Sequence, residues 1–124
     1  MRKTIAALII ILMLVFPGCV SQPELRFSTA PCDQDMDPYA KPAAGMLDDR
    51  WEDDGTFVAE GFVKTYCGGA NITGSYMLQG NDLVLKYRIT TGEAVTSCLC
   101  AHKVIYEFTN LQRRDYNVTL VPEG

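Results

Sequence analysis

From Thr56 onward, apolar residues recur at every second position, and this alternation is the feature that most restricts the fold. Between Thr56 and Cys67, the residues Phe57, Ala59, Gly61 and Val63 share one face, while Val58, Glu60, Phe62 and Lys64 share the other. Side chains of a β-strand point alternately to opposite faces, so a period of two predicts a strand with one buried face. No helical period of 3.6 residues is found beyond the first twenty residues.

Four further segments follow the same pattern and are separated by turn-forming residues. They are Ile72–Leu78, Leu83–Ile89, Lys103–Thr109 and Tyr116–Val121, and the first two are separated by Gln79-Gly80-Asn81-Asp82. Short connections favour antiparallel neighbours, and a sheet with one apolar face must bury that face against another layer. We therefore predict an all-β protein, a small antiparallel β-sandwich or partly open barrel of five to six strands.

The chain begins with Arg2 and Lys3, followed by twelve consecutive apolar residues from Ile5 to Phe16. A helix needs about 20 apolar residues to span a bilayer, so this run is short for a membrane anchor. A basic start, a short apolar run and a stop at small residues are typical of a secretory signal peptide. We expect residues 1–18 to be such a signal.

Phe16-Pro17-Gly18-Cys19 resembles the lipobox of prokaryotic membrane lipoproteins, although Pro17 is an unusual residue for that motif. The resemblance implies cleavage after Gly18 and a diacylglyceryl thioether on Cys19. Two acyl chains suffice for stable membrane anchoring. The predicted location is the extracytoplasmic face of the cell membrane, with the protein held there by its lipid.

We predict that residues 19–50 form a lipidated, Pro- and Asp-rich extended tether and that residues 51–124 form the β domain. The tether contains four prolines, which favour extended linkers. Within it, Glu24-Leu25-Arg26-Phe27 can add a short edge strand if Cys32 is held by a disulfide.

Five cysteines are present, and setting Cys19 aside for the lipid leaves Cys32, Cys67, Cys98 and Cys100. Four cysteines in a small exported domain predict two disulfides, with three possible pairings. Cys98 and Cys100 are two residues apart in an extended strand, which is a poor geometry for a mutual bond. Of the remaining pairings, we favour Cys67–Cys100 with Cys32–Cys98.

Cys98, Cys100 and His102 would project from one face of a strand, and two sulfurs with an imidazole could bind copper or zinc. This alternative requires reduced cysteines, whereas export favours oxidation. The disulfide interpretation is therefore preferred, and no cofactor is predicted.

Catalysis has little support, because His102 is the only histidine and no nucleophile elbow is present. Removing Arg2 and Lys3 lowers the basic count from 11 to 9 against 15 acids and changes the net charge from −4 to −6. An acidic domain disfavours nucleic acid as a partner. The segments Asp33–Asp37 and Asp48–Asp54 read as solvated acidic stretches, and Trp51 is expected to pack over one end of the sheet. Asn71 and Asn117 lie in glycosylation sequons.

Residues 67–98 are similar to the META-type domain of bacterial heat-shock lipoproteins. The matching residues are Cys67, Asn71, Gly74, Tyr76, Gly80, Leu83, Thr96 and Cys98, although Asn71 does not directly follow Cys67. The resemblance implies a small envelope β domain and assigns no functional residue. Together these features predict a lipid-anchored envelope protein with a non-catalytic binding or structural role toward another envelope protein or a small ligand.

Overall fold

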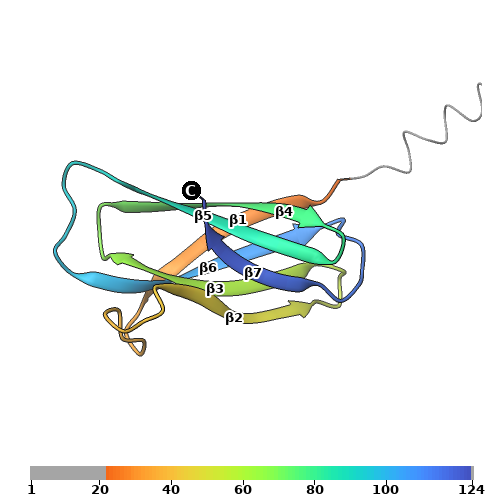
Figure 1. Ribbon diagram of the computed structural model, residues 1–124, viewed down its shortest axis with the longest axis horizontal. Helices are drawn as coiled ribbons and strands as arrows, with labels where there is room; N and C mark the ends of the chain where they lie inside the picture. Colours follow the sequence, from red (N-terminus) through yellow and green to blue (C-terminus); the bar gives the residue numbers. More distant parts are fainter. Residues whose placement is uncertain (1–21, 124) are drawn as a thin grey trace, which may run out of the picture.

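The computed structural model describes residues 22–123, and within them the chain forms seven β-strands and no helix (Figure 1). The strands are β1 (Glu24–Asp33), β2 (Ala44–Trp51), β3 (Phe57–Tyr66), β4 (Ala70–Gln79), β5 (Asp82–Thr91), β6 (Leu99–Thr109) and β7 (Asn117–Pro122). The all-β prediction is confirmed, and the five segments predicted by alternation correspond to β3, β4, β5, β6 and β7. The strand count is higher than predicted because β1 was expected only conditionally and β2 was not expected.

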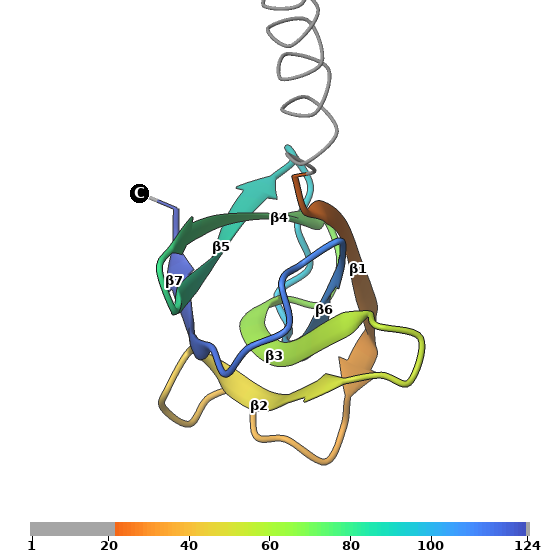
Figure 2. The same cartoon turned by 90° about the vertical axis from the view of Figure 1, so that its right-hand side faces the viewer.

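The strands form a four-stranded sheet in the order β1-β6-β3-β2 and a three-stranded sheet in the order β4-β5-β7. The two sheets curve around a common interior when viewed along the strands (Figure 2). At their edges β1 lies near β4 and β2 lies near β7. The arrangement is a small β-sandwich.

The expectation of antiparallel pairing between successive strands is wrong for part of the chain. Only β2–β3 and β4–β5 are both sequential and paired, and β7 pairs with β5 in parallel. The reason is that successive strands run in alternate directions along the sandwich. β5 and β7 are separated by one strand, so they run the same way, and β7 adds in parallel to the free edge of β5.

The prediction of an extended tether over residues 19–50 is wrong, because β1 and nearly all of β2 fall in this range. β1 pairs with β6 from Glu24–Thr109 to Asp33–Ala101, and β2 pairs with β3. Pro31 is accommodated because β1 is an edge strand with a register shift between Thr29 and Cys32, where a missing N–H donor costs little. The conditional expectation of an edge strand at Glu24–Phe27 is confirmed, and that strand is longer than expected.

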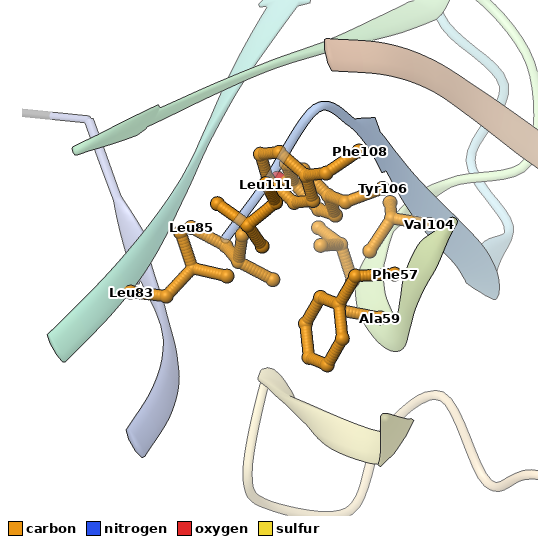
Figure 3. Close-up of a cluster of buried hydrophobic side chains, with 9 residues drawn as sticks. Phe57, Ala59, Leu83, Leu85, Val104, Tyr106, Phe108 and Leu111 are labelled. Atoms are coloured by element: carbon orange, nitrogen blue, oxygen red, sulfur yellow. The ribbon is translucent and has the colours of Figure 1, made fainter. Parts of the chain in front are cut away.

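The core lies between the sheets and is built by the faces that the alternation predicted. Its buried residues come from β3, β5 and β6 and from the loop after β6, and they are Phe57, Ala59, Val63, Leu83, Leu85, Val104, Tyr106, Phe108 and Leu111 (Figure 3). Burial of such side chains is the main force that holds two sheets together.

Trp51 packs at one end of this core, as expected. Its ring lies 4.9 Å from the ring of Phe57 and 6.4 Å from that of Tyr116, measured between centroids. Its indole N–H donates to the backbone oxygen of Arg114 at 3.3 Å. The polar edge of the indole is therefore paired while its apolar body covers the end of the sheet.

The sandwich has two ends with different chemistry. The N-terminal pole contains Pro23 and the connections 52–56, 80–81 and 110–116. The cysteine pole contains the connections 34–43, 67–69 and 92–98 and all four cysteines of the described residues. Figure 1 shows β1 starting at the right, at the N-terminal pole, and running to the cysteine pole at the left.

Candidate functional site

Two disulfides are formed at the cysteine pole, as the cysteine count predicted, but their pairing differs from the favoured one. Cys32 is bonded to Cys100, and Cys67 is bonded to Cys98, each with a Cα–Cα distance of 5.6 Å. The expectation that Cys98 and Cys100 do not bond to each other is confirmed.

The strand register explains this pairing. β3 and β6 are antiparallel, and the backbone N–H of Cys67 donates to the oxygen of Cys98 at 3.0 Å, so these two residues lie opposite each other. On the other side of β6, Cys32 of β1 lies in register with His102 and close to Cys100. Because β6 lies between β1 and β3, Cys100 of β6 bonds to Cys32 of β1, whereas Cys98, just before β6, bonds to Cys67, just after β3.

The structure therefore assembles a different sulfur and imidazole group from the predicted Cys98, Cys100 and His102. Cys98 is bonded to Cys67, and the second cysteine that lies beside Cys100 and His102 is Cys32. Ligand atoms of Cys32, Cys100 and His102 all lie within 4.8 Å of one another. The spacing within 98–102 identified two members of this group, and the third required the pairing of β1 with β6.

A cleft of about 310 Å³ is lined by two members of this group, Cys32 and Cys100, and by Cys67 of the other disulfide, but not by His102. Met36 also lines it, with Leu99 and Pro38 among its apolar residues. Met36 was not identified from the sequence as a site residue, because a single methionine in a loop has no distinctive pattern.

The acidic segment that contains Asp33 and Asp37 forms turns. The carboxylate of Asp33 accepts the backbone N–H of Asp35 at 2.9 Å, and that of Asp37 accepts the N–H of Tyr39 at 2.9 Å. Side-chain oxygens that bond the backbone two residues on are typical of Asx turns. These two acids stabilise the loop between β1 and β2.

Arg50 organises the second acidic segment, although the sequence analysis did not single it out. Its guanidinium contacts Asp48 at 3.0 Å, Glu52 at 2.9 Å and Glu60 at 3.4 Å. Hydrogen bonds with Asp48 and then Glu52 raise the pKa of Arg50. The signal available in the sequence was a single arginine among the acids of residues 48–54.

An open groove of about 590 Å³ follows the outer face of the four-stranded sheet beside Arg50. Its lining includes Glu52, Glu60 and Glu107, so its charge is mainly negative. At its end, the backbone N–H of Thr56 donates to Asp54 at 3.0 Å and lowers the pKa of that carboxyl. The groove lies far along the sheet from the cysteines. Glu52 and Glu60 are paired with Arg50, and Asp54 is paired with the turn.

Both sequon asparagines are exposed on strands. Asn71 is an exposed residue of β4. The side-chain amide of Asn117 donates to the carboxylate of Asp82 at 3.3 Å. Their modification stays a prediction.

The signal peptide and the lipidated Cys19 lie outside the described residues. Among residues 22–123, no helix has the length and apolar character required to cross a bilayer. The chain matches no family model, no curated protein and no solved structure. The resemblances to the lipobox and to the META-type domain therefore stay predictions.

Proposed function

We propose that the chain is a lipid-anchored lipoprotein of the cell envelope, whose extracytoplasmic β domain has a non-catalytic binding or structural role. The observation that carries this proposal is the pair of disulfides joining neighbouring strands at one pole. Disulfides persist in oxidising, exported compartments. They account for the four cysteines other than Cys19, which leaves Cys19 available for the lipid.

The start of β1 supports a domain held close to the membrane. β1 begins at Glu24, five residues after Cys19. Five extended residues reach at most about 18 Å. A lipid on Cys19 would therefore direct the N-terminal pole to the bilayer and the cysteine pole away from it.

The cysteine pole then offers the surface that another envelope protein can reach. Tyr39, Tyr66 and Val95 are large apolar side chains at this end with exposed fractions of 71%, 37% and 39%. Exposed aromatic residues are enriched where proteins bind one another. The proposed role is consistent with contact to a partner at this pole.

Mass spectrometry of the protein extracted from membranes tests the anchor. The expected species begins at Cys19 and carries a diacylglyceryl group, and Cys19→Ser is expected to leave the membrane fraction. A chain that retains residues 1–18 and lacks lipid would overturn the anchoring proposal. In the same sample, alkylation without reductant should label none of Cys32, Cys67, Cys98 and Cys100.

A further inference from the structure

Three potential metal ligands converge on one point of the cysteine pole. Cys100 and His102 are two residues apart on β6, and Cys32 reaches them from β1. One ligand atom from each lies within 4.8 Å of the other two. Two sulfurs and one imidazole form a soft donor set, which favours Cu(I) over hard cations.

A hydrogen bond to the backbone engages one nitrogen of the His102 ring and leaves the other available as a ligand. The Nε2 atom of the ring lies 3.0 Å from the backbone oxygen of Tyr66. A carbonyl oxygen only accepts hydrogen bonds, so Nε2 carries the proton and Nδ1 keeps its lone pair. Metal-binding histidines commonly donate their other ring N–H to a backbone carbonyl, which fixes the tautomer. This contact is independent of the cysteines and is already present in the oxidised protein.

The cleft beside the two sulfurs, which His102 does not line, adds a further soft side chain and apolar surface. Met36 lines it beside Cys32 and Cys100, and a thioether is a further soft ligand. Leu99 and Pro38 add apolar surface. The Cys67–Cys98 disulfide has no second histidine to act as a ligand, because His102 is the only histidine of the chain.

We propose that reduction of the Cys32–Cys100 disulfide converts this group into a Cu(I) site formed by Cys32, Cys100 and His102. The reductant is a dithiol, of the class that thiol–disulfide oxidoreductases supply. Its thiolate attacks the exposed Cys32 sulfur, the S–S bond breaks, and Cys100 leaves as a thiolate and takes a proton. The second thiol of the reductant resolves the mixed disulfide.

The overall reduction transfers two electrons and two protons to the protein and leaves the reductant as a disulfide. Binding of Cu(I) then releases the two thiol protons, which gives a site with two thiolates, one neutral imidazole and a net charge of −1. The two sulfurs must move apart to hold a metal between them. Cys32 can move because β1 pairs only with β6 and its register already shifts between Thr29 and Cys32.

Cu(I) titration of the full chain in detergent tests the site. The background is Cys19→Ser, which removes the remaining thiol, and a chromophoric Cu(I) chelator serves as competitor under anaerobic conditions. The protein reduced with a phosphine is expected to bind a single Cu(I), and the oxidised protein none. Binding of the same amount by the oxidised protein would overturn the proposal.

Two matched cysteine variants locate the ligands. Cys67→Ser with Cys98→Ser is expected to retain the Cu(I) site, whereas Cys32→Ser with Cys100→Ser is expected to lose it. The reverse pattern, or equal binding by both, would contradict the assignment.

His102→Gln leaves all four cysteines in place and therefore tests the contribution of the imidazole alone. Its amide can still donate to the Tyr66 oxygen but supplies no imidazole. Cu(I) affinity is expected to fall more than about tenfold, since even the loss of an outer-shell partner costs 10–100-fold. Unchanged affinity would exclude His102 as a ligand. The inference does not depend on the lipid anchor, and either proposal can fail alone.

Discussion

Tyr106 joins the two sheets by a hydrogen bond as well as by packing. It lies on β6 with no exposed surface, and its hydroxyl donates to the backbone oxygen of Lys86 on β5 at 2.7 Å. Burial, and then the nearby Tyr87, raise the pKa of Tyr106. The neutral phenol is therefore the form that the folded protein requires.

Tyr106→Phe should lower the free energy of unfolding by about 1 kcal/mol at neutral pH, because the Lys86 oxygen loses its partner. The pKa of Tyr106 is higher in the folded state than the unfolded value of about 10. This difference stabilises the fold fully below that pH, and the stabilisation is lost as the pH rises toward the folded-state pKa. Urea unfolding of both proteins, measured at pH values from 8 to above about 10, checks both effects. The variant should lose less stability than the wild type above about pH 10.

Gly74 of β4 is needed because the ring of Phe27 lies against its backbone. A Cβ at this position would be closer to Phe27 Cδ1 than van der Waals contact allows. Phe27 in turn packs edge-on against Tyr106 with a centroid distance of 4.9 Å. The absence of a side chain at Gly74 therefore lets β1 close one corner of the sandwich.

Gly74→Ala is expected to destabilise the domain by about 1–3 kcal/mol through overpacking. Gly92→Ala is the matched control, since a Cβ there meets only Gly69 O, at 3.8 Å. It should change stability by less than about 0.5 kcal/mol. Thermal unfolding of the two variants compares them, and equal losses would refute the packing argument at Gly74.

At the scale of elements, the two disulfides constrain different parts of the fold. Cys32–Cys100 attaches the edge strand β1 to β6 and spans 68 residues, whereas Cys67–Cys98 joins the ends of β3 and β6 and spans 31. Crosslinks that close longer loops restrict the unfolded chain more strongly.

Removing Cys32–Cys100 with a double serine substitution should therefore cost more than removing Cys67–Cys98. Loop-closure entropy gives about 4.4 kcal/mol for the longer loop and about 3.7 kcal/mol for the shorter one. Urea unfolding of the two variants, followed by Trp51 fluorescence, measures the difference. A larger loss for Cys67→Ser with Cys98→Ser would mean that strain or unfolded-state structure outweighs loop length.

At the scale of the whole molecule, the two poles differ in what they can contact. The N-terminal pole contains the only tryptophan, Trp51, and the cysteine pole contains both disulfides. If Cys19 carries a lipid, the N-terminal pole lies next to the headgroups.

Trp51 then reports the orientation of the lipidated protein. In vesicles with a spin label on the lipid headgroups, its fluorescence is expected to be quenched more strongly in the lipidated protein than in Cys19→Ser. Equal quenching in both proteins would contradict the proposed orientation.

Much of the fold could be predicted from the sequence because alternation directly encodes which face of a strand is buried. β3, β5 and β6 repeat apolar residues at every second position, and their predicted faces form the core. Only the start of β1 was predicted, and only conditionally, because Pro31 and the acids of β1 and the acids of β2 obscure short apolar patterns at the sheet edges. Leu25 and Phe27 nevertheless pack against the core.

The sequence by itself determined the fold class, the number of disulfides and the faces that form the core, since these depend on local periodicity and on the parity of the cysteines. Only the tertiary structure decided which cysteines bond, that β7 pairs in parallel with β5, and that Cys32 joins Cys100 and His102. The reason is physical, because strand order and register are set by contacts between residues far apart in the chain. No local pattern encodes that β6 lies between β1 and β3.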